Sequence, residues 1–261
     1  MIPLSETAIQ NALATKRLGR HVEIHGTLES TQTTLRERAA GLPEGAVVFA
    51  ECQTRGRGRM ERRFFAPRGA GLYMSLLLRP NLPPAEIHFT TLAAAVAVCR
   101  ALEDLHGLAP GIKWVNDVFC GGKKICGILS EGSIGAEGRN VEHVMLGIGV
   151  NTGPVPGEVR EIAASVGELT AAPVDRNPLA AAIFNHLEPL CDGLANPAER
   201  VKLTGEYTRR QIILNKRVAV HDAARVYEAL VLGIDPNGAL VIQTDDGEIS
   251  RLNAGEVSLR F

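Results

Sequence analysis

Short apolar runs alternate with amphipathic stretches along most of the chain. The runs are bounded by turn residues and predict strands over residues 21–25, 46–52, 71–79, 111–120, 123–132 and 141–150. Apolar residues at helical spacing predict helices over residues 5–13, 32–41, 83–105, 160–169 and 177–194. Ser5, Ser30 or Thr31, and Pro83-Pro84 mark the starts of the first three helices. This pattern indicates an α+β fold with helices packed on a mixed or antiparallel sheet.

The pattern changes near residue 215. From there on, short β runs over residues 217–221, 225–234, 239–244 and 248–259 are separated by tight turns rich in Asp, Asn and Gly. We therefore predict a small β-barrel over residues 215–261 and a larger domain over residues 1–214. A unit of this size is only marginally stable alone, so the barrel should pack against the larger domain.

Composition narrows the function classes. With 261 residues, of which 45% are hydrophobic, the chain can build a substantial core. A formal net charge of -1 argues against a general nucleic-acid binder, which needs a broad basic surface. The five cysteines show no Cys-x-x-Cys spacing and indicate neither a zinc site nor a disulfide framework. There is no signal-peptide pattern, and the longest apolar run, residues 92–99, is far below the ~20 residues that cross a bilayer. We therefore expect a cytoplasmic protein without membrane contact.

Arginine is concentrated in the loop that follows the strand over residues 46–52. This arginine loop (residues 53–63) begins Gln-Thr-Arg-Gly-Arg-Gly-Arg at Gln53 and continues through Arg62 and Arg63. Its glycines let the backbone approach an anion closely, and its arginines offer planar forks of donors that match carboxylate and phosphate oxygens. Glu61 alone relieves the repulsion among the arginines, so we expect the empty loop to be mobile and an anionic ligand to order it.

Four further segments accompany the arginine loop. They read Ser30-Thr31-Gln32, Lys113-Trp114-Val115-Asn116-Asp117, Lys123-Lys124-Ile125-Cys126-Gly127-Ile128-Leu129 and Gly147-Ile148-Gly149-Val150-Asn151. Taken in order with the loop, this set resembles that of the biotin protein ligases over roughly residues 20–155. The closing Gly255-Glu256-Val257 extends the resemblance to the terminal small domain. The resemblance implies a class II synthetase-like biotin/lipoate ligase catalytic domain followed by an SH3-like barrel.

The resemblance also implies a reaction in two steps. Biotin and ATP form biotinyl-5'-AMP with loss of pyrophosphate, and biotin then passes to a lysine of the biotin carboxyl carrier domain of acetyl-CoA carboxylase or a related carboxylase. The biotin carboxylate is already ionised at pH 7, so the first step needs no general base. It needs cations, because each pair of like charges about 4 Å apart costs on the order of 4 kcal/mol at an effective dielectric near 20. ATP implies Mg²⁺ as well, although no cluster of aspartates identifies its ligands.

Family motifs assign these steps to particular residues. Lys124 aligns with the lysine that bridges the biotin carboxylate and the α-phosphate, and is the expected main catalytic residue together with Arg59. For the transfer, Asp117 would accept a proton from the amine or orient it, and Lys113 would stabilise developing negative charge. The implied biotin-binding residues are Ser30, Thr31, Gln53, Gly56, Arg57, Arg59, Lys124, Gly127 and Gly147. The implied ATP-binding or adenylate-binding residues are Arg57, Arg59, Arg62, Phe64, Asn116, Lys124 and Asn151.

Simpler interpretations exist for several of these residues. Ser30 and Thr31 could merely cap a helix, Lys124 could be a solvated hairpin lysine, and Phe64 could be a core residue. The chain also departs from the family pattern, with Gln32 for Asn, Val115 for Pro, Met60-Glu61 for Arg-Gly and Phe64 for Trp.

Other function classes remain open at this point. Lipoate or octanoate transfer enzymes share the architecture, and only the groups that bind the ring distinguish the substrate. An RNA-contacting arm is a second alternative, but the arginine loop contains no aromatic residue for base stacking. Residues 1–20 leave no room for the DNA-binding helix-turn-helix domain of some relatives, so we expect no DNA partner. Either a monomer or a homodimer is compatible with the sequence.

Overall fold

The computed structural model of the chain describes residues 2–135, 141–221, 225–253 and 256–259. A seven-stranded sheet forms its centre, in the order β1-β2-β3-β7-β6-β5-β4. Strands β1 and β2 run parallel, and every other neighbouring pair is antiparallel. The strands are β1 Val22–His25, β2 Val47–Ala50, β3 Gly71–Leu78, β4 Gly111–Lys113, β5 Asp117–Cys120, β6 Lys123–Ile134 and β7 Val141–Asn151. The predicted mixed sheet is confirmed.

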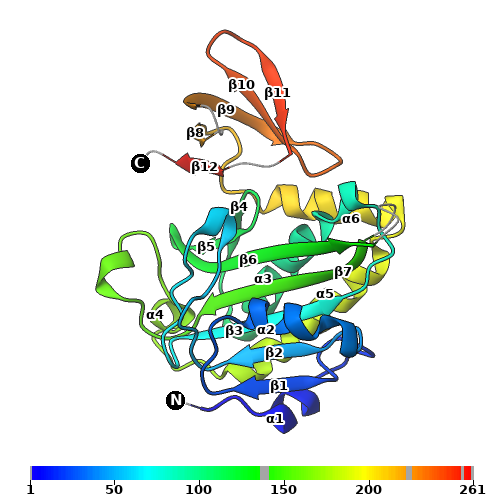
Figure 1. Ribbon diagram of the computed structural model, residues 1–261. Helices are drawn as coiled ribbons and strands as arrows, with labels where there is room; N and C mark the ends of the chain where they lie inside the picture. Colours follow the sequence, from blue (N-terminus) through cyan, green and yellow to red (C-terminus); the bar gives the residue numbers. More distant parts are fainter. Residues whose placement is uncertain (1, 136–140, 222–224, 254–255, 260–261) are drawn as a thin grey trace.

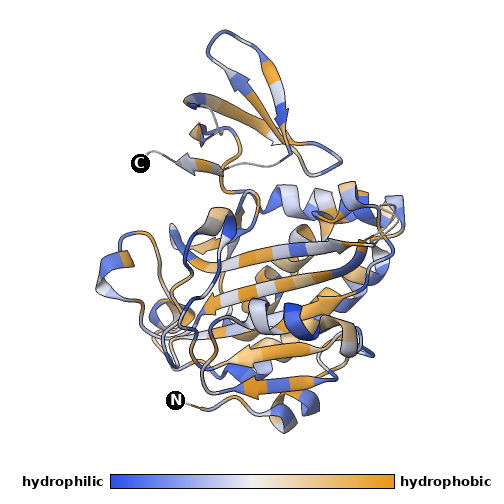
Figure 2. Ribbon diagram, in the orientation of Figure 1, coloured by the Kyte–Doolittle hydropathy of each residue, from blue (hydrophilic) through white to orange (hydrophobic). Residues whose placement is uncertain are grey.

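Helices cover both faces of this sheet (Figure 1). Helices α3 (Phe89–His106) and α5 (Arg176–Gly193) pack together on one face, and α6 (Pro197–Arg209) packs against α3. Helix α2 (Thr31–Arg38), continued by the 3-10 turn Ala39–Gly41, covers part of the opposite face. The short helix α1 (Glu6–Asn11) is capped by Ser5 as predicted, and α2 is capped by Ser30. The apolar residues follow these elements, with the sheet and α3 mainly hydrophobic (Figure 2).

Helix α3 is the centre of the larger apolar layer. Together with the preceding turn it is long and apolar enough to meet the length and hydropathy criteria for crossing a membrane. However, 72% of its most apolar window is buried within the protein. The helix is therefore placed as a core helix, which explains its composition without a bilayer.

Several sequence predictions need correction. The helix expected from Pro83 begins only at Phe89, after a 3-10 turn at Pro84–Glu86, and the β run expected over residues 248–259 is two strands, Ile249–Leu252 and Glu256–Leu259. The single strand expected over residues 111–120 is two short strands, β4 and β5, which pair with each other around a turn at residues 114–116. The helix expected over residues 160–169 begins only at α4 (Val166–Thr170), where Ser165 and Glu168 form a capping box. Helix α6 was not predicted, although Asn196 at its N-cap and Pro197 in its first turn are ordinary start residues.

The C-terminal segment forms a separate antiparallel sheet of five strands, in the order β11-β10-β9-β8-β12. These strands are β8 Arg217–His221, β9 Val226–Ile234, β10 Leu240–Thr244, β11 Ile249–Leu252 and β12 Glu256–Leu259. The small domain lies beyond the β4 edge of the central sheet (Figure 1). It packs on the larger unit as predicted, because the Trp114 indole N–H donates to Gly238 O at 3.1 Å. Gly255 of the closing motif lies outside the described residues.

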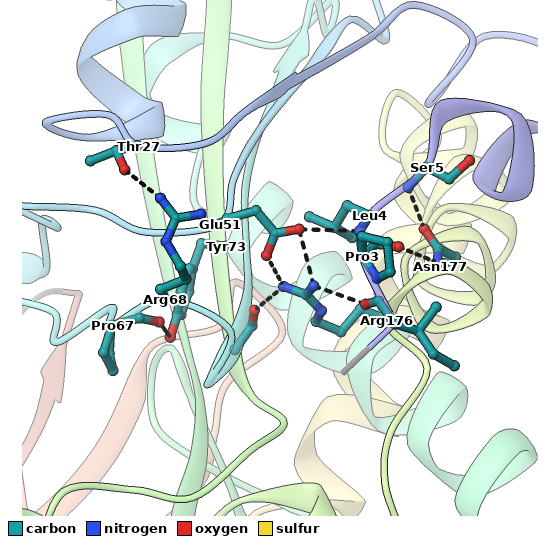
Figure 3. Close-up of polar contacts among 12 residues, drawn as sticks. Pro3, Leu4, Ser5, Thr27, Glu51, Pro67, Arg68, Tyr73, Arg176 and Asn177 are labelled. Carbon is teal, nitrogen blue, oxygen red and sulfur yellow. Dashed lines mark hydrogen bonds and ion pairs between the residues drawn. The ribbon is translucent and has the colours of Figure 1, made fainter.

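A buried ion pair fastens the N-terminal segment to the sheet (Figure 3). Arg176, at the first turn of α5, is 1% exposed and donates to both carboxylate oxygens of Glu51, at 2.7 and 3.1 Å. Arg176 also donates to Ile2 O, and Glu51 accepts the Leu4 N–H at 3.1 Å. Burial by itself would raise the pKa of Glu51, but the hydrogen bonds from Arg176 and Leu4 outweigh it and hold that pKa below its usual value.

Candidate functional site

A cavity of about 320 Å³ lies between the arginine loop and the face of the central sheet that carries α2. This volume suits one small organic ligand. Thirteen of the predicted site residues line it, namely Ser30, Thr31, Gln53, Arg57, Arg59, Arg62, Phe64, Lys113, Asn116, Asp117, Lys124, Gly127 and Gly147. The structure therefore brings together side chains as far apart in the sequence as Ser30 and Lys124.

Glycines form the floor of the cavity. Gly127 on β6 faces Gly149 on β7, and both point to the same side of the sheet as Gly147. A Cβ at Gly149 would lie 2.6 Å from the Phe64 ring, and a Cβ at Gly147 would lie 2.9 Å from Gln32 Oε1. Only glycine allows Phe64 and Gln32 to rest directly on the sheet at these positions. This is the physical reason for the glycine spacing in the sequence motif.

An uncharged polar cluster occupies one end of the cavity. The Thr31 N–H donates to Gln53 Oε1 at 2.8 Å, and Thr31 Oγ1 lies 3.2 Å from the same oxygen. Thr31 Oγ1 also lies 2.9 Å from Ser75 Oγ, which donates to Gln32 Oε1 at 2.9 Å. Gln32 Nε2 donates in turn to Met145 O at 2.9 Å. Buried hydroxyl and amide groups of this kind suit a neutral ring with both donors and acceptors.

Ser30 contributes to both the helix and the cavity. Its Oγ accepts the Gln32 N–H at 3.2 Å and caps α2, and the residue also lines the cavity. The capping interpretation of Ser30 is confirmed, and its predicted contact with biotin stays a prediction.

Charged groups lie in the neighbouring part of the cavity. Lys124 Nζ is 2.6 Å from Asp117 Oδ1, and Arg59 Nη1 donates to Asn116 Oδ1 at 3.0 Å. Asn116 Nδ2 donates to Ile128 O at 2.7 Å, which fixes the amide against β6. The Lys124 and Asp117 side chains are each about two-thirds or more shielded from solvent, so their charges are only partly screened.

Residues that face one another across adjacent strands form a row perpendicular to the strands. The two ends of the cavity lie over two neighbouring rows of this kind. Ser75 faces Gly147 and Gly147 faces Leu129 in the row of the polar cluster. Gly149 faces Gly127 in the next row on the same side, and Gly127 faces Asp117. Two residues along a strand span about 7 Å. A ligand with a neutral ring and a carboxylate a few bonds away could thus reach both ends at once.

The hairpin that carries Asn116 and Asp117 is held from behind by buried groups. Tyr207 donates its hydroxyl to Val115 O at 2.8 Å, and Gln211 Oε1 accepts the Trp114 N–H at 3.1 Å. Burial raises the pKa of Tyr207, so its hydroxyl stays protonated as a donor. Trp114 is buried, as expected of a core residue, but it also lines the cavity.

Carboxylates from outside the arginine loop pair with its arginines. Arg57 donates to both carboxylate oxygens of Glu131, at 3.0 and 3.2 Å, and Arg55 Nη1 lies 3.0 Å from Glu29 Oε1. The expectation that Glu61 alone offsets the arginines was therefore wrong. Folding brings two distant carboxylates to the loop, and Arg57 extends toward Glu131 on β6. The predicted mobility of the empty loop stays a prediction.

Two predicted site residues do not line the cavity. Gly56 lies where a Cβ would be 2.4 Å from Phe64 O, and its own carbonyl accepts the Phe64 N–H at 2.8 Å. Gly56 therefore helps to close the arginine loop and does not form part of the cavity wall. Asn151 Nδ2 donates to Ala164 O at 3.1 Å, which ties the end of β7 to the segment before α4.

The sequence interpretation missed several residues of the cavity wall. Ser75 is fully buried and is the one polar side chain in an otherwise apolar strand, a signal that could have identified it. Ile162 and Val257 also line the cavity. Nothing in the local pattern of Ile162 sets it apart, and Val257 belongs to the closing motif of the small domain but was not predicted to reach the site. Val257 belongs to β12, so the small domain contributes to the wall.

The described residues offer no protein-built metal site, because no group of three or more His, Cys, Asp or Glu side chains among them is arranged to hold an ion. Asp117 is the only carboxylate in the described cavity wall, and Lys124 pairs with it. These residues do not fit a resident divalent cation.

Comparisons with known proteins agree over nearly the whole chain. The Biotin/lipoate A/B protein ligase family matches residues 26–151, and the Biotin protein ligase C terminal domain matches residues 213–260. The chain is 36% identical to the bifunctional ligase/repressor BirA of Bacillus subtilis, over 98% of this chain and 79% of that protein. It is 31% identical to the biotin–[acetyl-CoA-carboxylase] ligase of Mycobacterium tuberculosis, over 98% of this chain and 95% of that protein.

The fold of the chain is also similar to that of solved biotin protein ligase structures. The chain superposes on the biotin protein ligase from Aquifex aeolicus in complex with biotin and ATP with a TM-score of 0.78. The two are 26% identical, and the match covers 92% of this chain and 99% of the other.

Proposed function

Because this chain belongs to the biotin protein ligase family, we propose that the cavity is where biotin and ATP react. The protein is an ATP-dependent ligase that converts biotin to biotinyl-5'-AMP with release of pyrophosphate. It then transfers the biotin to a lysine of a biotin carboxyl carrier domain.

One observation carries the assignment of the site. A buried uncharged cluster around Thr31 and Ser75 adjoins the charged pair Lys124–Asp117, within one cavity and on neighbouring rows of the sheet. Biotin has a matching distribution of groups, with a neutral ureido ring at one end and a carboxylate at the other. We place the ring at the cluster and the carboxylate toward Lys124.

For adenylation we assign the leading role to Lys124. Its ammonium would lie between the biotin carboxylate and the α-phosphate and offset the repulsion between these anions. Asp117, 2.6 Å away, orients the ammonium, and Arg59, held by Asn116, adds a second cation on the same side. We assign Arg62 and Phe64 to nucleotide binding. The Phe64 ring lies over Gly127 and Gly149.

For the transfer we assign Asp117 to the incoming amine. A carrier lysine must lose a proton before its nitrogen attacks the acyl-adenylate carbonyl, and a carboxylate at this place can accept or orient that proton. Lys113 lines the same cavity and would stabilise the negative charge that develops on the departing AMP. The C–O bond to AMP breaks as the amide bond forms.

Magnesium belongs to the substrate in this scheme. The cavity wall has no built metal site among its described residues, so the ion would enter as MgATP with phosphate and water ligands. We place the reaction in the cytoplasm, and we assign residues 1–214 to catalysis and residues 215–261 to the small domain that completes the wall through Val257.

The test is pyrophosphate release with MgATP and biotin, beside matched reactions with lipoate, with octanoate and without acid. We expect release that depends on biotin. Release with lipoate or octanoate instead would move the protein to the related acyl-transfer class. The Lys124→Ala variant should stay folded and lose pyrophosphate formation, and turnover near the wild-type rate would reject the role of Lys124.

A further inference from the structure

Glu131 joins the arginine loop to two other elements of the fold. Its carboxylate on β6 accepts both arms of Arg57 from the loop, and its Oε2 lies 2.7 Å from Arg36 Nη2 on α2. Glu131 lies on the same face of β6 as Gly127 and Leu129, two residues beyond the row of the polar cluster. The contact is therefore at the edge of the site, past the end assigned to the biotin ring.

The geometry of this ion pair distinguishes it from an ordinary surface pair. The Glu131 side chain is 25% exposed, and its bond with Arg57 is bidentate, which adds direction as well as energy. By contrast, the Arg55–Glu29 pair of the same loop has a single contact at 3.0 Å and side chains that are 76% and 57% exposed. Exposed pairs of that kind contribute little, because solvent and salt screen them. Glu131 is thus the stronger of these two attachments.

A restraint on Arg57 also restrains the rest of the arginine loop, because backbone contacts join its two sides. Arg57 pairs with Arg63 in an antiparallel bridge, and the Gly58 N–H donates to Arg62 O at 2.7 Å. The Phe64 N–H donates to Gly56 O at 2.8 Å, so the loop is a hairpin whose two strands move together. A contact at Arg57 therefore restrains both Arg59 and Phe64 over the cavity.

We propose that Glu131 is a positioning residue that fastens the arginine loop over the cavity through Arg57, and so sets how long the acyl-adenylate is retained before the carrier arrives. The inference rests on the proposed function. Glu131 touches neither the reacting carboxylate nor the phosphates in this arrangement. Its effect should therefore appear in escape of the intermediate and not in the bond-forming step.

Glu131→Gln tests this, with Glu29→Gln as the matched control because it removes the same charge from the exposed pair of the same loop. With biotinyl-5'-AMP preformed on the enzyme and chased with unlabelled intermediate, Glu131→Gln should release it at least about tenfold faster than wild type. Adenylation in a single turnover at saturating biotin should stay within about twofold, while the KM for biotin rises. Glu29→Gln should match wild type in each measurement.

Limited trypsin digestion gives a readout that needs no activity. The arginine loop carries five trypsin sites, at Arg55, Arg57, Arg59, Arg62 and Arg63. In the ligand-free protein, Glu131→Gln should be cut there several times faster than wild type or Glu29→Gln, with unchanged circular dichroism.

Wild-type rates of intermediate release and loop cleavage in Glu131→Gln would overturn the proposal, as would equal effects of both variants. A wild-type protein that forms no biotinyl-5'-AMP at all would instead count against the proposed function, and the trypsin comparison would still decide the role of Glu131.

Discussion

At the scale of single residues, Gly149 shows how a missing side chain shapes the site. A Cβ at this position would approach the Phe64 ring to 2.6 Å, so the ring has room to lie against the sheet only because the residue is glycine. The backbone of Gly149 does not need a left-handed conformation, so the constraint is entirely one of space. A substitution here tests the position of Phe64 and not the flexibility of the strand.

We expect Gly149→Ala to displace Phe64 and the loop attached to it. The kcat/KM for ATP in pyrophosphate release should fall by about tenfold or more, which is roughly 1.4 kcal/mol of lost transition-state stabilisation. Overpacking at a buried contact costs ~1–3 kcal/mol, so thermal stability should fall only modestly.

Gly233→Ala is the matched control, because Gly233 also lies in a strand and nothing would touch its Cβ within 4 Å. It should leave the kinetics unchanged. Wild-type kcat/KM for ATP in Gly149→Ala would show that the Phe64 position is irrelevant to nucleotide use.

At the scale of elements, the Glu51–Arg176 pair joins strand β2, helix α5 and the N-terminal segment. Removing one partner of a buried pair leaves the other charge uncompensated, at a cost of about 3–5 kcal/mol. Arg176 is almost fully buried, so Glu51→Gln should lower the free energy of unfolding by about 3 kcal/mol at neutral pH.

The difference in the free energy of unfolding between wild type and Glu51→Gln should shrink as the pH falls. The folded pKa of Glu51 lies below its ordinary value near 4.5, so the unfolded chain binds the proton more readily. The contribution of the Glu51 charge is therefore fully present above about pH 4.5 and disappears as the pH falls through the lowered folded pKa. Denaturant unfolding of wild type and Glu51→Gln from pH 7 to pH 3 should show curves that converge in acid. A constant difference down to pH 3 would contradict the assignment of this pKa to the ion pair.

Elements with strong local signals were predicted well, and elements defined by neighbours were not. Strand β3 has a long uninterrupted pattern and was found near its predicted bounds. Helix α3 ends where predicted but begins only at Phe89, after the 3-10 turn Pro84–Glu86. The predicted strand over residues 111–120 failed because only three residues separate β4 from β5, and two of them, Trp114 and Val115, are apolar and resemble a continuing strand. Asn116 and Asp117 are a local turn signal, but the conformation of the turn is held by Tyr207 and Gln211, from a helix and a segment about a hundred residues away.

The same contrast, between residues that a sequence motif marks and residues that only their neighbours place, holds for the site. Motif residues such as Lys124, Asp117 and Gly147 were assigned to the site through the family resemblance, and the structure brings them together in the cavity. The places of Glu131 and Val257 at the site were not predicted. Their positions follow from the fold of the loop and the docking of the small domain, which no short pattern encodes.

At the scale of the whole molecule, the turn at Gly238 connects the two units. Gly238 has φ of +81°, and a Cβ there would lie 3.0 Å from Leu92 and 3.4 Å from the His88 ring. His88 Nε2 lies 2.6 Å from Asn237 O, and Trp114 donates to Gly238 O. The turn is therefore both conformationally demanding and tightly packed against α3.

We expect Gly238→Ala to weaken the docking of the small domain by about 1–2 kcal/mol. Trp114 is the only tryptophan and is buried at this junction, so its fluorescence should shift to the red at denaturant concentrations below those that unfold the helices. Gly247→Ala carries the same left-handed strain, with φ of +86°, but its Cβ would touch nothing. If both variants behave alike, the effect is turn strain and not docking.

The polar cluster has a further consequence when its protons are counted. Gln32 and Gln53 present oxygens, because Met145 O and the Thr31 N–H fix the orientation of the two amides. The four side chains are connected by three short oxygen–oxygen contacts, and each contact needs a proton to be a hydrogen bond. Thr31 and Ser75 supply only two hydroxyl protons between them. One of the three contacts must therefore lack a proton, and these four side chains together are short of one hydrogen-bond donor. In the proposed placement, the two N–H groups of the biotin ring would supply the missing donor, whereas a dithiolane ring or an alkyl chain has none to offer. The cluster would therefore favour a carboxylic acid whose far end carries hydrogen-bond donors.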